Sequence, residues 1–436
     1  MKRFAIPLIL LFAALAFAAP AGHAQGVVKI TVEGPIHPIA EEYLARALDH
    51  AAKTNAAAVL VVLRTPGGLV TSTRGMVEKI LASKAPVIVY VAPSGAQAAS
   101  AGFFLLQAAD VAAMSPGSNT GAAHPVTVGG DKIDEVMKGK MVNDAAAFMR
   151  SYVSKRGRNT ELAESAVRES KSWTDQEALK QNLIDVVAND ERDLFRQLEG
   201  REVTRFNGEK ARLSLANAEV TPYPMSLKQQ ILGWLMDPNI SFLVLAIGAL
   251  ALYAEFNNPG AIIPGVVGLI FILLAAFALN LLPIRFAAVT LILVAFLLFG
   301  LEAKFTSHGV LGIGGVVALT LGGLLLVDGP IPEMRVKLWT ALAVSVPFGL
   351  ISVFLMSIAI RARRNKVTTG EQGMIGEIGV ARTELAPAGK VFVHGEVWDA
   401  HATSNIRAGE SVRVRQVNGL RLEVEPAERQ QTLPAS

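Results

Sequence analysis

The sequence contains no cysteine and has little net charge for its length. The absence of cysteine from all 436 residues excludes disulfide bonds, thiolate metal sites and a cysteine nucleophile. The formal net charge is only +4, and no basic block interleaved with aromatic residues occurs. Nucleic-acid binding is therefore not predicted. Histidines and carboxylates with metal-ligand spacing are also missing, so we expect no metal and no cofactor.

Hydrophobic residues are abundant instead, at 51% of the chain against 18% charged residues, which predicts a membrane protein. Five apolar stretches lie at 241–253, 261–282, 286–301, 310–327 and 338–360. Several approach the length of about 20 residues that a helix needs to cross a bilayer. We expect an all-α transmembrane domain over 241–361 with about five helices; four or six spans are the alternatives. The preceding segment, 221–240, is amphipathic and is expected to lie along the membrane surface.

The N-terminus has the pattern of an export signal. Lys2 and Arg3 precede an apolar run, and small residues lead up to Ala24. These features predict a signal peptide over 1–24 that is cleaved after Ala24, with an uncleaved anchor as the alternative. Either one exports the domain that follows.

Charge after the last apolar stretch predicts the orientation in the membrane. Four basic residues lie there: Arg361, Arg363, Arg364 and Lys366. Because basic loops favour the cytoplasm, this end is expected inside and the domain at 25–220 outside. Arg285 and Arg335 would lie on the outer side, against the rule.

Residues 25–220 are mixed in character and begin with a βαβαβ pattern. The runs VVKITVE, AAVLVVL and APVIVYV read as strands, and two segments with helical spacing separate them. The second and third runs do not alternate, as expected where both faces of a strand are covered. The pattern predicts an α/β domain with a parallel sheet.

The C-terminal segment, 366–436, contains short strands punctuated by glycine. Valines alternate with arginines in SVRVRQVNG, which predicts a small antiparallel barrel with one face in water. No cluster of catalytic residue types occurs in it. We interpret it as a binding or assembly module.

Ser100 stands alone as a hydroxyl in the segment GAQAASAGFF, directly after a predicted strand. The residues that follow it predict a helix, so the N–H of Ala101 is expected to be free at the helix N-terminus. The turn TPGGL lies between a strand and a helix, where the N–H groups of Gly67 and Gly68 are also expected to be unpaired. Together these groups could form an oxyanion hole beside a serine nucleophile.

The succession LRTPGGLV, SGAQAASAGFF, MSPGSNTGAAHPV, KMVNDAAAFMRSYVSKRGRN and SWTDQEALKQNLID resembles the NfeD family, membrane-bound relatives of the Clp protease proteolytic subunit. The resemblance covers essentially the whole chain. It implies a Clp/crotonase-like α/β serine protease domain, a multi-span membrane domain and an OB-like C-terminal barrel. It also implies a Ser-Lys dyad in which Ser100 is the nucleophile and Lys140 is the base.

The candidate base has alternatives. Lys140 is expected just before a helix, after a mobile loop over 129–140, and a helix N-terminus disfavours the ammonium form. Lys138 is the nearest competitor. His124 follows Ser100 at nearly the spacing of the histidine in the Clp subunit, so a histidine-containing triad is the rival arrangement. Asp175 is its one candidate third member, within a helix-start motif.

The resemblance implies a membrane-anchored endopeptidase that cleaves hydrophobic segments of membrane-associated proteins such as stomatin-like partners. It further implies a homo-oligomer, with a dimer of the protease domain. A non-catalytic scaffold that binds stomatin-like proteins is the alternative. An acyl-CoA hydratase or isomerase, which shares the sheet architecture, lacks the expected paired carboxylates.

Overall fold

The computed structural model describes residues 26–126, 134–257, 262–305, 307, 309–364 and 371–427. The chain forms two compact units, which divide between Leu350 and Ile351. The first contains an α/β domain and apolar helices, and the second contains a β-barrel. The predicted signal peptide lies outside the described residues.

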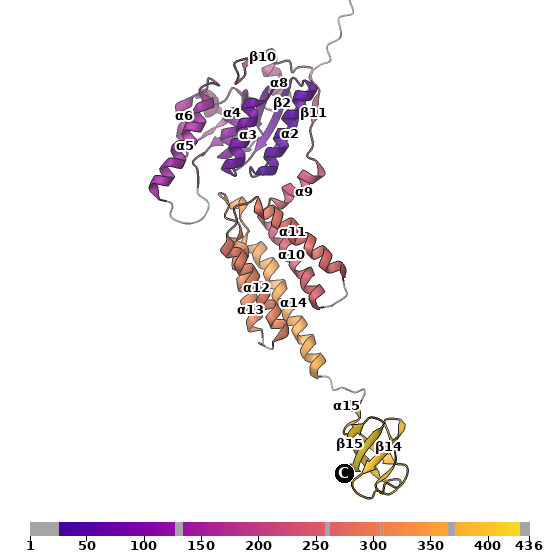
Figure 1. The fold of residues 1–436 in the computed structure, drawn as a ribbon. Helices are drawn as coiled ribbons and strands as arrows, with labels where there is room; N and C mark the ends of the chain where they lie inside the picture. The colour runs from indigo at the N-terminus through magenta and orange to yellow at the C-terminus, as the bar shows by residue number, and fades with distance from the viewer. Residues whose placement is uncertain are drawn as a thin grey trace, which may run out of the picture. The chain divides into compact units, whose positions relative to one another are not determined.

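A six-stranded parallel sheet is the framework of the α/β domain (Figure 1), in the order β11-β1-β2-β3-β5-β8. The strands are β1 (Val27–Glu33), β2 (Ala58–Arg64), β3 (Val87–Val91), β5 (Val111–Met114), β8 (Val186–Val187) and β11 (Val220–Pro222). Helices α2 (Pro38–Thr54) and α3 (Val70–Ala82) connect the first three, which confirms the predicted βαβαβ order. All five residues of β3 are buried, in accord with its unbroken apolar run.

Both faces of this sheet are covered. Helices α2, α3 and α4 (Ala101–Ala108) pack on one face, in a core that includes Val61 and Val89. The other face packs against α8 (Glu191–Leu198) and the hairpin of β9 (Glu202–Thr204) and β10 (Lys210–Arg212), around Leu60 and Ile88.

A second sheet of three short strands lies at the end of β2. It contains β4 (Gln97–Ala99), β6 (Asn119–Gly121) and β7 (Ser172–Thr174), in the order β4-β6-β7. An isolated bridge between Thr65 and Ala98 joins it to the end of β2. The remaining helices of the domain are α5 (Glu135–Val153), α6 (Thr160–Arg168) and α7 (Asp175–Lys180).

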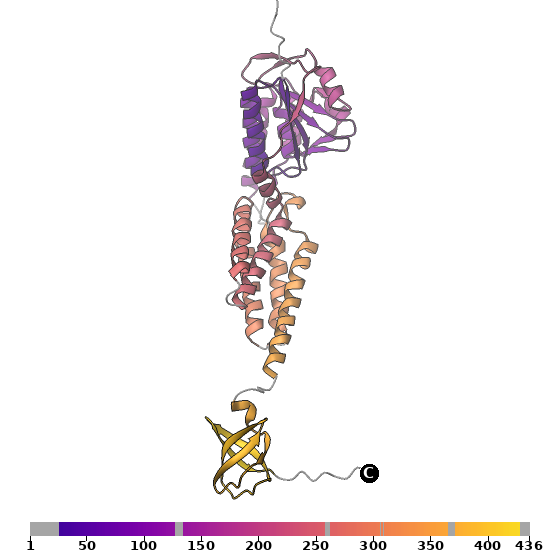
Figure 2. The same ribbon diagram turned by 90° about the vertical axis from the view of Figure 1, so that its right-hand side faces the viewer.

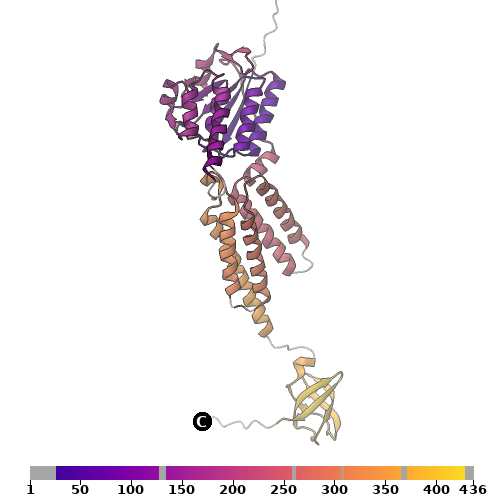
Figure 3. The same ribbon diagram turned by 60° about the vertical axis from the view of Figure 1, so that its left-hand side comes forward.

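Five apolar helices follow, at the five predicted stretches: α10 (Pro238–Asn257), α11 (Ile262–Asn280), α12 (Phe286–Lys304), α13 (Val310–Leu326) and α14 (Leu338–Arg364). They lie alongside one another, with α10 against α11 and α12 against α13 (Figure 3). Three described segments are long and apolar enough to cross a membrane: 238–256, 262–280 and 332–351. The apolar helices at 286–302 and 310–326 are shorter. A short helix, α9 (Leu227–Leu235), precedes them, and a 3-10 turn, η1 (Pro332–Met334), precedes α14.

The second unit contains a closed five-stranded barrel in the order β12-β13-β14-β16-β15, visible in yellow in Figure 2. After the short helix α15 (Glu371–Met374), its strands are β12 (Ile378–Ala381), β13 (Ala388–Val393), β14 (Glu396–Ala402), β15 (Ser411–Asn418) and β16 (Arg421–Pro426). Val412 and Val414 are buried while Arg413 is exposed, as the alternation predicts. The expectation of a wholly antiparallel barrel is wrong at one pair, because β14 and β16 run parallel.

Candidate active site

The turn after β2 is held against the strand that leads to Ser100. Thr65 N–H donates to Gln97 O (2.8 Å), and Ala99 N–H donates to Thr65 O (3.1 Å). These backbone bonds extend the pairing of β2 onto β4. Two segments separated by thirty residues of sequence therefore meet, as the spacing of the motifs led us to expect.

Ser100 lies at the point where β4 ends and α4 begins. Its backbone angles are φ 52° and ψ −112°, the conformation of the first central residue of a type II′ turn, which glycine favours. Ser100 N–H donates to Gly121 O (2.8 Å), and Ser100 O accepts from Phe103 N–H (3.0 Å), so both sides of the residue are fixed. Strain of this kind costs about 1–3 kcal/mol and is concentrated at functional sites.

Gly67 is needed because its backbone touches Ser100. A Cβ atom on Gly67 would lie 2.9 Å from Ser100 Cβ and 3.2 Å from Ser100 Oγ, and the φ of Gly67 is +130°. The expectation that the Gly67 N–H is free is wrong, because it donates to Thr65 Oγ1 (3.1 Å). The sequence reasoning missed that the threonine hydroxyl, buried beneath the turn, can reach back to this amide.

Two backbone N–H groups remain available beside Ser100. Those of Gly68 and Ala101 make no hydrogen bond within the described part of the chain. Both residues line the same pocket as Ser100. Ala101 is the first residue of α4, where the helix dipole favours negative charge. The backbone of Gly68 packs against the backbone of Ile36. A Cβ atom on Gly68 would lie only 2.2 Å from Ile36 O, so no side chain fits there.

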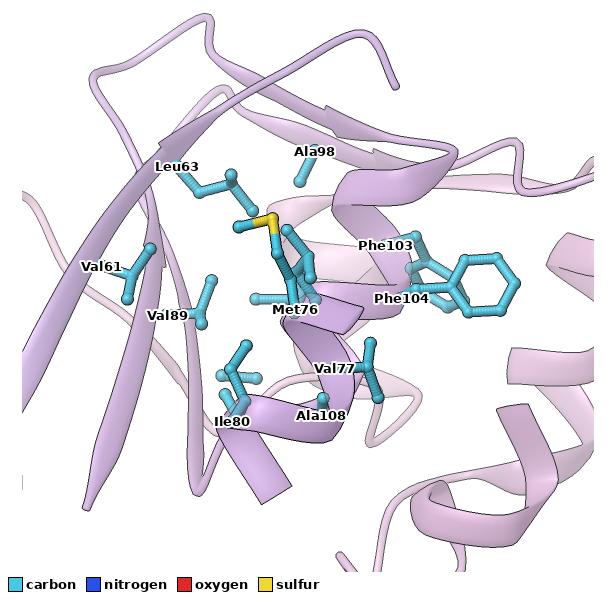
Figure 4. Close-up of a cluster of buried hydrophobic side chains, with 14 of the residues drawn as sticks. Val61, Leu63, Met76, Val77, Ile80, Val89, Ala98, Phe103, Phe104 and Ala108 are labelled. Carbon is cyan, nitrogen blue, oxygen red and sulfur yellow. The ribbon is translucent and has the colours of Figure 1, made fainter. Parts of the chain in front are cut away.

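The pocket at Ser100 is small, largely apolar and open to solvent. Besides the residues above, it is lined by Val70, Thr73, Arg74, Phe104, Ala123, Pro125, Ala145 and Phe148. The lining comes from α3, α4 and α5 and from the segment after β6. Figure 4 shows the buried core next to it, where Met76, Val77 and Ile80 of α3 pack against side chains of β2, β3 and α4.

One wall of the pocket contains a charged group in contact with an aromatic ring. Arg74 Cζ lies 4.4 Å from the centroid of the Phe148 ring. The same guanidinium pairs with Asp144. The three residues therefore fasten α3 to α5 across the pocket. This wall was not predicted from the sequence. The available signal was the i, i+3, i+4 spacing of Val70, Thr73 and Arg74, which places the three residues on one face of a helix.

The helix that begins at Ser100 is also fixed at its C-terminal end. Arg156 donates to Ala108 O (2.7 and 3.0 Å), and Arg158 donates to Gln107 O (2.8 Å). Tyr152 OH donates to Phe104 O (3.2 Å), and complete burial raises the pKa of this phenol, so it stays a donor. These contacts hold α4, and with it Ser100 and Ala101, in a single position.

Neither candidate lysine lines the pocket. The expectation that Lys140 stands before a helix is wrong, because α5 begins at Glu135 and contains both Lys138 and Lys140. Three good helix formers, Glu135, Met137 and Lys138, extend the helix backwards, and Gly139 does not end it. Both lysines are exposed, on turns of α5 that precede its first buried residue, Ala145. Residues 129–133 of the expected loop lie outside the described residues.

The two lysines differ in their relation to the pocket wall. Lys138 precedes Ala145 by seven residues, so it lies on the helix face that turns toward the pocket. Lys140 lies about 160° away from Lys138 around the helix axis, because two residues turn the helix by about 200°, so it lies on nearly the opposite face. Neither ammonium forms an ion pair with a described residue.

His124 is turned away from the pocket. Its neighbours Ala123 and Pro125 line the pocket, whereas His124 does not. His124 Nδ1 lies 2.8 Å from Val167 O, which can only accept, so Nδ1 carries the proton. Asp175 does not approach this ring; its carboxylate accepts from Gly117 N–H (3.1 Å) at the start of α7, as the helix-start motif predicted.

The arrangement can hold a carbonyl group at Ser100. A hydroxyl without a hydrogen-bond partner among the described residues lines an apolar pocket together with two residues whose N–H groups are free. Attack on a carbonyl carbon with stabilisation of the resulting oxyanion requires groups of these kinds.

Comparison with known proteins places each part of the chain. Residues 26–220 match the model of the NfeD1b N-terminal domain, residues 239–358 the NfeD integral membrane domain, and residues 371–426 the NfeD-like C-terminal, partner-binding domain. Membrane-bound protease PH1510 of Pyrococcus horikoshii is 33% identical over 437 residues, which cover 97% of each chain. Membrane protein NfeD1b of Bacillus subtilis is 27% identical over 425 residues, 92% of each chain.

A solved structure is also similar in sequence: the 1510-N membrane protease specific for a stomatin homolog from Pyrococcus horikoshii. It is 31% identical, with a TM-score of 0.43, and the match covers 49% of this chain and all of that one. The chain is a member of the NfeD family of membrane proteins.

Proposed function

We propose that this protein is a membrane-anchored serine endopeptidase with Ser100 as its nucleophile. The observation that carries the proposal is the strained Ser100, which lines an apolar pocket together with Gly68 and Ala101, whose N–H groups are free. Membership of a family that includes a membrane-bound protease, 33% identical along almost the whole chain, supports it.

The proposed reaction uses these groups in order. Ser100 Oγ attacks the carbonyl carbon of the peptide bond, and its proton passes to the base. The carbonyl π electrons move to the oxygen, which the N–H groups of Gly68 and Ala101 stabilise. Collapse of this intermediate breaks the C–N bond, and the amine leaves with the proton from the base. Water then hydrolyses the acyl-serine ester by the same steps.

We propose a lysine of α5 as the base. The resemblance assigns Lys140, and the helix geometry makes Lys138 the competitor. Either one requires the first turns of α5 to approach Ser100 when substrate is bound, since both are exposed in the structure described. His124 does not line the pocket at Ser100, and this position disfavours a histidine base.

The proposed substrates are apolar segments of stomatin-like membrane proteins. The apolar lining by Val70, Phe104 and Phe148 supports a hydrophobic side chain next to the cleaved bond. We propose that the α/β domain is extracytoplasmic and the barrel cytoplasmic, and that the domain forms a homodimer. Val136 and Met137, 62% and 51% exposed beside the two lysines, are apolar residues that a second copy could cover.

Cleavage of apolar fluorogenic peptides by the full chain in lipid nanodiscs tests the proposal. Ser100→Ala should abolish cleavage, and Lys140→Ala should reduce it by about 10²-fold or more, as expected for loss of a general base. Lys138→Ala and His124→Ala are the matched controls and should retain activity. Loss with Lys138→Ala alone would move the base to that lysine.

The alternative is a scaffold that binds stomatin-like proteins without cleaving them. The family description of the C-terminal segment as a partner-binding domain favours this role for the barrel. The two functions separate in a deletion strain: full complementation by Ser100→Ala would support the scaffold and contradict the protease.

A further inference from the structure

An apolar row crosses three adjacent strands on the outer surface of the barrel. Val380 of β12 pairs with Phe392 of β13, and Phe392 pairs with Val397 of β14. Val380 is 42% exposed and Val397 is 56% exposed. Ile378, two residues before Val380 and therefore on the same face of β12, is 60% exposed. These four side chains, the outer row, contribute nothing to the barrel core.

Two guanidinium groups border the outer row. Arg382 Cζ lies 4.9 Å from the centroid of the Phe392 ring, so the charge stands next to the aromatic face. Arg413 of β15 pairs directly with Ile378 across the strands. Neither arginine forms an ion pair within residues 371–427. Lys390, also on β13, is neutralised by Asp399 at 3.0 Å.

We propose that the outer row is the surface through which the barrel binds an extended segment of its protein partner. Barrels of the OB type bind ligands on the face of their second and third strands, which here are β13 and β14. Because the barrel is closed, it offers no free strand edge, and side chains rather than backbone pairing must provide the binding. The family description of residues 371–426 as partner-binding agrees with this placement.

The chemistry of the row defines the partner segment. Three aliphatic side chains and one ring fit a segment with aliphatic residues at alternating positions, and the two free arginines fit a carboxylate beside them. Nucleic acid fits less well, because residues 371–427 carry eight carboxylates against six lysines and arginines. The partner we name, a stomatin-like membrane protein, rests on the proposed function.

The test measures binding of a purified stomatin-like membrane protein to the full chain in nanodiscs. Ser100→Ala is present throughout, so that no cleavage occurs. The row variant combines Val380→Ser with Val397→Ser, and Leu420→Ser is the matched control, since Leu420 is 81% exposed and lies outside the row. Fluorescent oligo-thymidine is the second probe.

We expect the row variant to raise the Kd by about tenfold or more, the loss typical of interface anchor residues, and the control to bind like the parent. Equal binding by parent and row variant would overturn the proposal. An equal rise of the Kd in the row variant and in the control would also overturn it, and so would the absence of binding by the parent. Binding of oligo-thymidine by the parent and the control, but not by the row variant, would show that the row binds nucleic acid instead. Apolar peptide cleavage by chains that retain Ser100 reports the active site separately and should not change with the row variant.

Discussion

Ser100 has backbone angles that a serine rarely adopts, and the surrounding contacts force them. Its N–H donates a hydrogen bond to Gly121 O of β6, and its carbonyl accepts one from Phe103 N–H of α4. The residue therefore cannot relax without loss of both hydrogen bonds. The strain aims Oγ into the pocket instead of into the α4 packing.

Ser100→Gly should therefore be more stable than Ser100→Ala by about 1–2 kcal/mol, because glycine adopts φ 52° without strain. Both variants lack the hydroxyl and should be inactive. Urea unfolding of the two variants measures the difference. Equal stability would mean that the strain inferred at this position is absent.

Gly67→Ala should abolish peptide cleavage and lower the free energy of unfolding by about 2 kcal/mol or more, since a Cβ there meets Ser100 at 2.9 Å. Gly95→Ala is the control, with a φ of +82° but no atom within 4 Å of the added carbon. The control should lose some stability and keep its activity. Full activity of Gly67→Ala would show that the close approach to Ser100 is not required.

The site residues could be predicted only in part, and Gly67 shows why. The strand-PGG-helix order led to both glycines, but the Thr65 hydroxyl that occupies the Gly67 N–H is a tertiary contact that no sequence spacing reveals. The pocket wall of Arg74 and Phe148 was missed for the same reason, since α3 and α5 meet only in the folded domain.

At the scale of elements, the strands, helices and apolar spans were largely predictable because their periodicity is strong. The start of α5 was not, because the segment 129–140, with three glycines and three lysines, reads as a loop until its helical contacts are known. The parallel pair β14–β16 was also missed, since alternation fixes the buried face of a strand and says nothing of its direction.

The start of α2 depends on an uncharged His37. Its Nδ1 accepts from Ala40 N–H (3.3 Å), and burial lowers its pKa from 6.5 to about 4. The unfolded chain therefore binds a proton at a higher pH than the folded chain. The contribution of His37 to the free energy of unfolding is therefore fully present above about pH 6.5. It is lost as the pH falls from about 6.5 to 4, and the loss amounts to up to about 3 kcal/mol.

Urea unfolding across that pH range measures this loss. His37→Asn keeps a cap acceptor but cannot titrate, so its unfolding free energy should depend less on pH than that of the wild type. If the two proteins show the same dependence on pH, His37 is not the group responsible.

Helix α9 exposes one apolar face and buries another. Leu227, Ile231 and Trp234 are 72%, 41% and 68% exposed at helical spacing, while Leu232 and Leu235 are buried. This face directly precedes the first apolar helix, α10, and Trp favours the membrane interface. We expect it to lie in the headgroup region of the bilayer.

Because the chain has no cysteine, spin labels on single introduced cysteines report this placement without background. In nanodiscs, a spin label on Trp234→Cys should be relaxed more by oxygen, which concentrates in lipid, than by a water-soluble nickel complex. A label on Lys228→Cys should be relaxed more by the nickel complex, because Lys228 is exposed and lies 100° around the helix from Leu227. Preference for nickel at both positions would place α9 in water.

For the whole molecule, the order of parts could be read from the sequence: an α/β domain, apolar helices, then a barrel. The sequence could not show that a lysine reaches Ser100, and the described structure leaves both lysines of α5 exposed. The proposed nucleophile and oxyanion donors therefore rest on contacts, and the proposed base rests on resemblance.

The most direct test of the central claim uses the intact chain in nanodiscs, treated with an apolar peptide phosphonate that mimics the tetrahedral intermediate. Mass spectrometry of the digested protein then locates the adduct. The account predicts one adduct, on Ser100, which disappears in Ser100→Ala. An adduct on another residue, or none while apolar peptides are still cleaved, would contradict it.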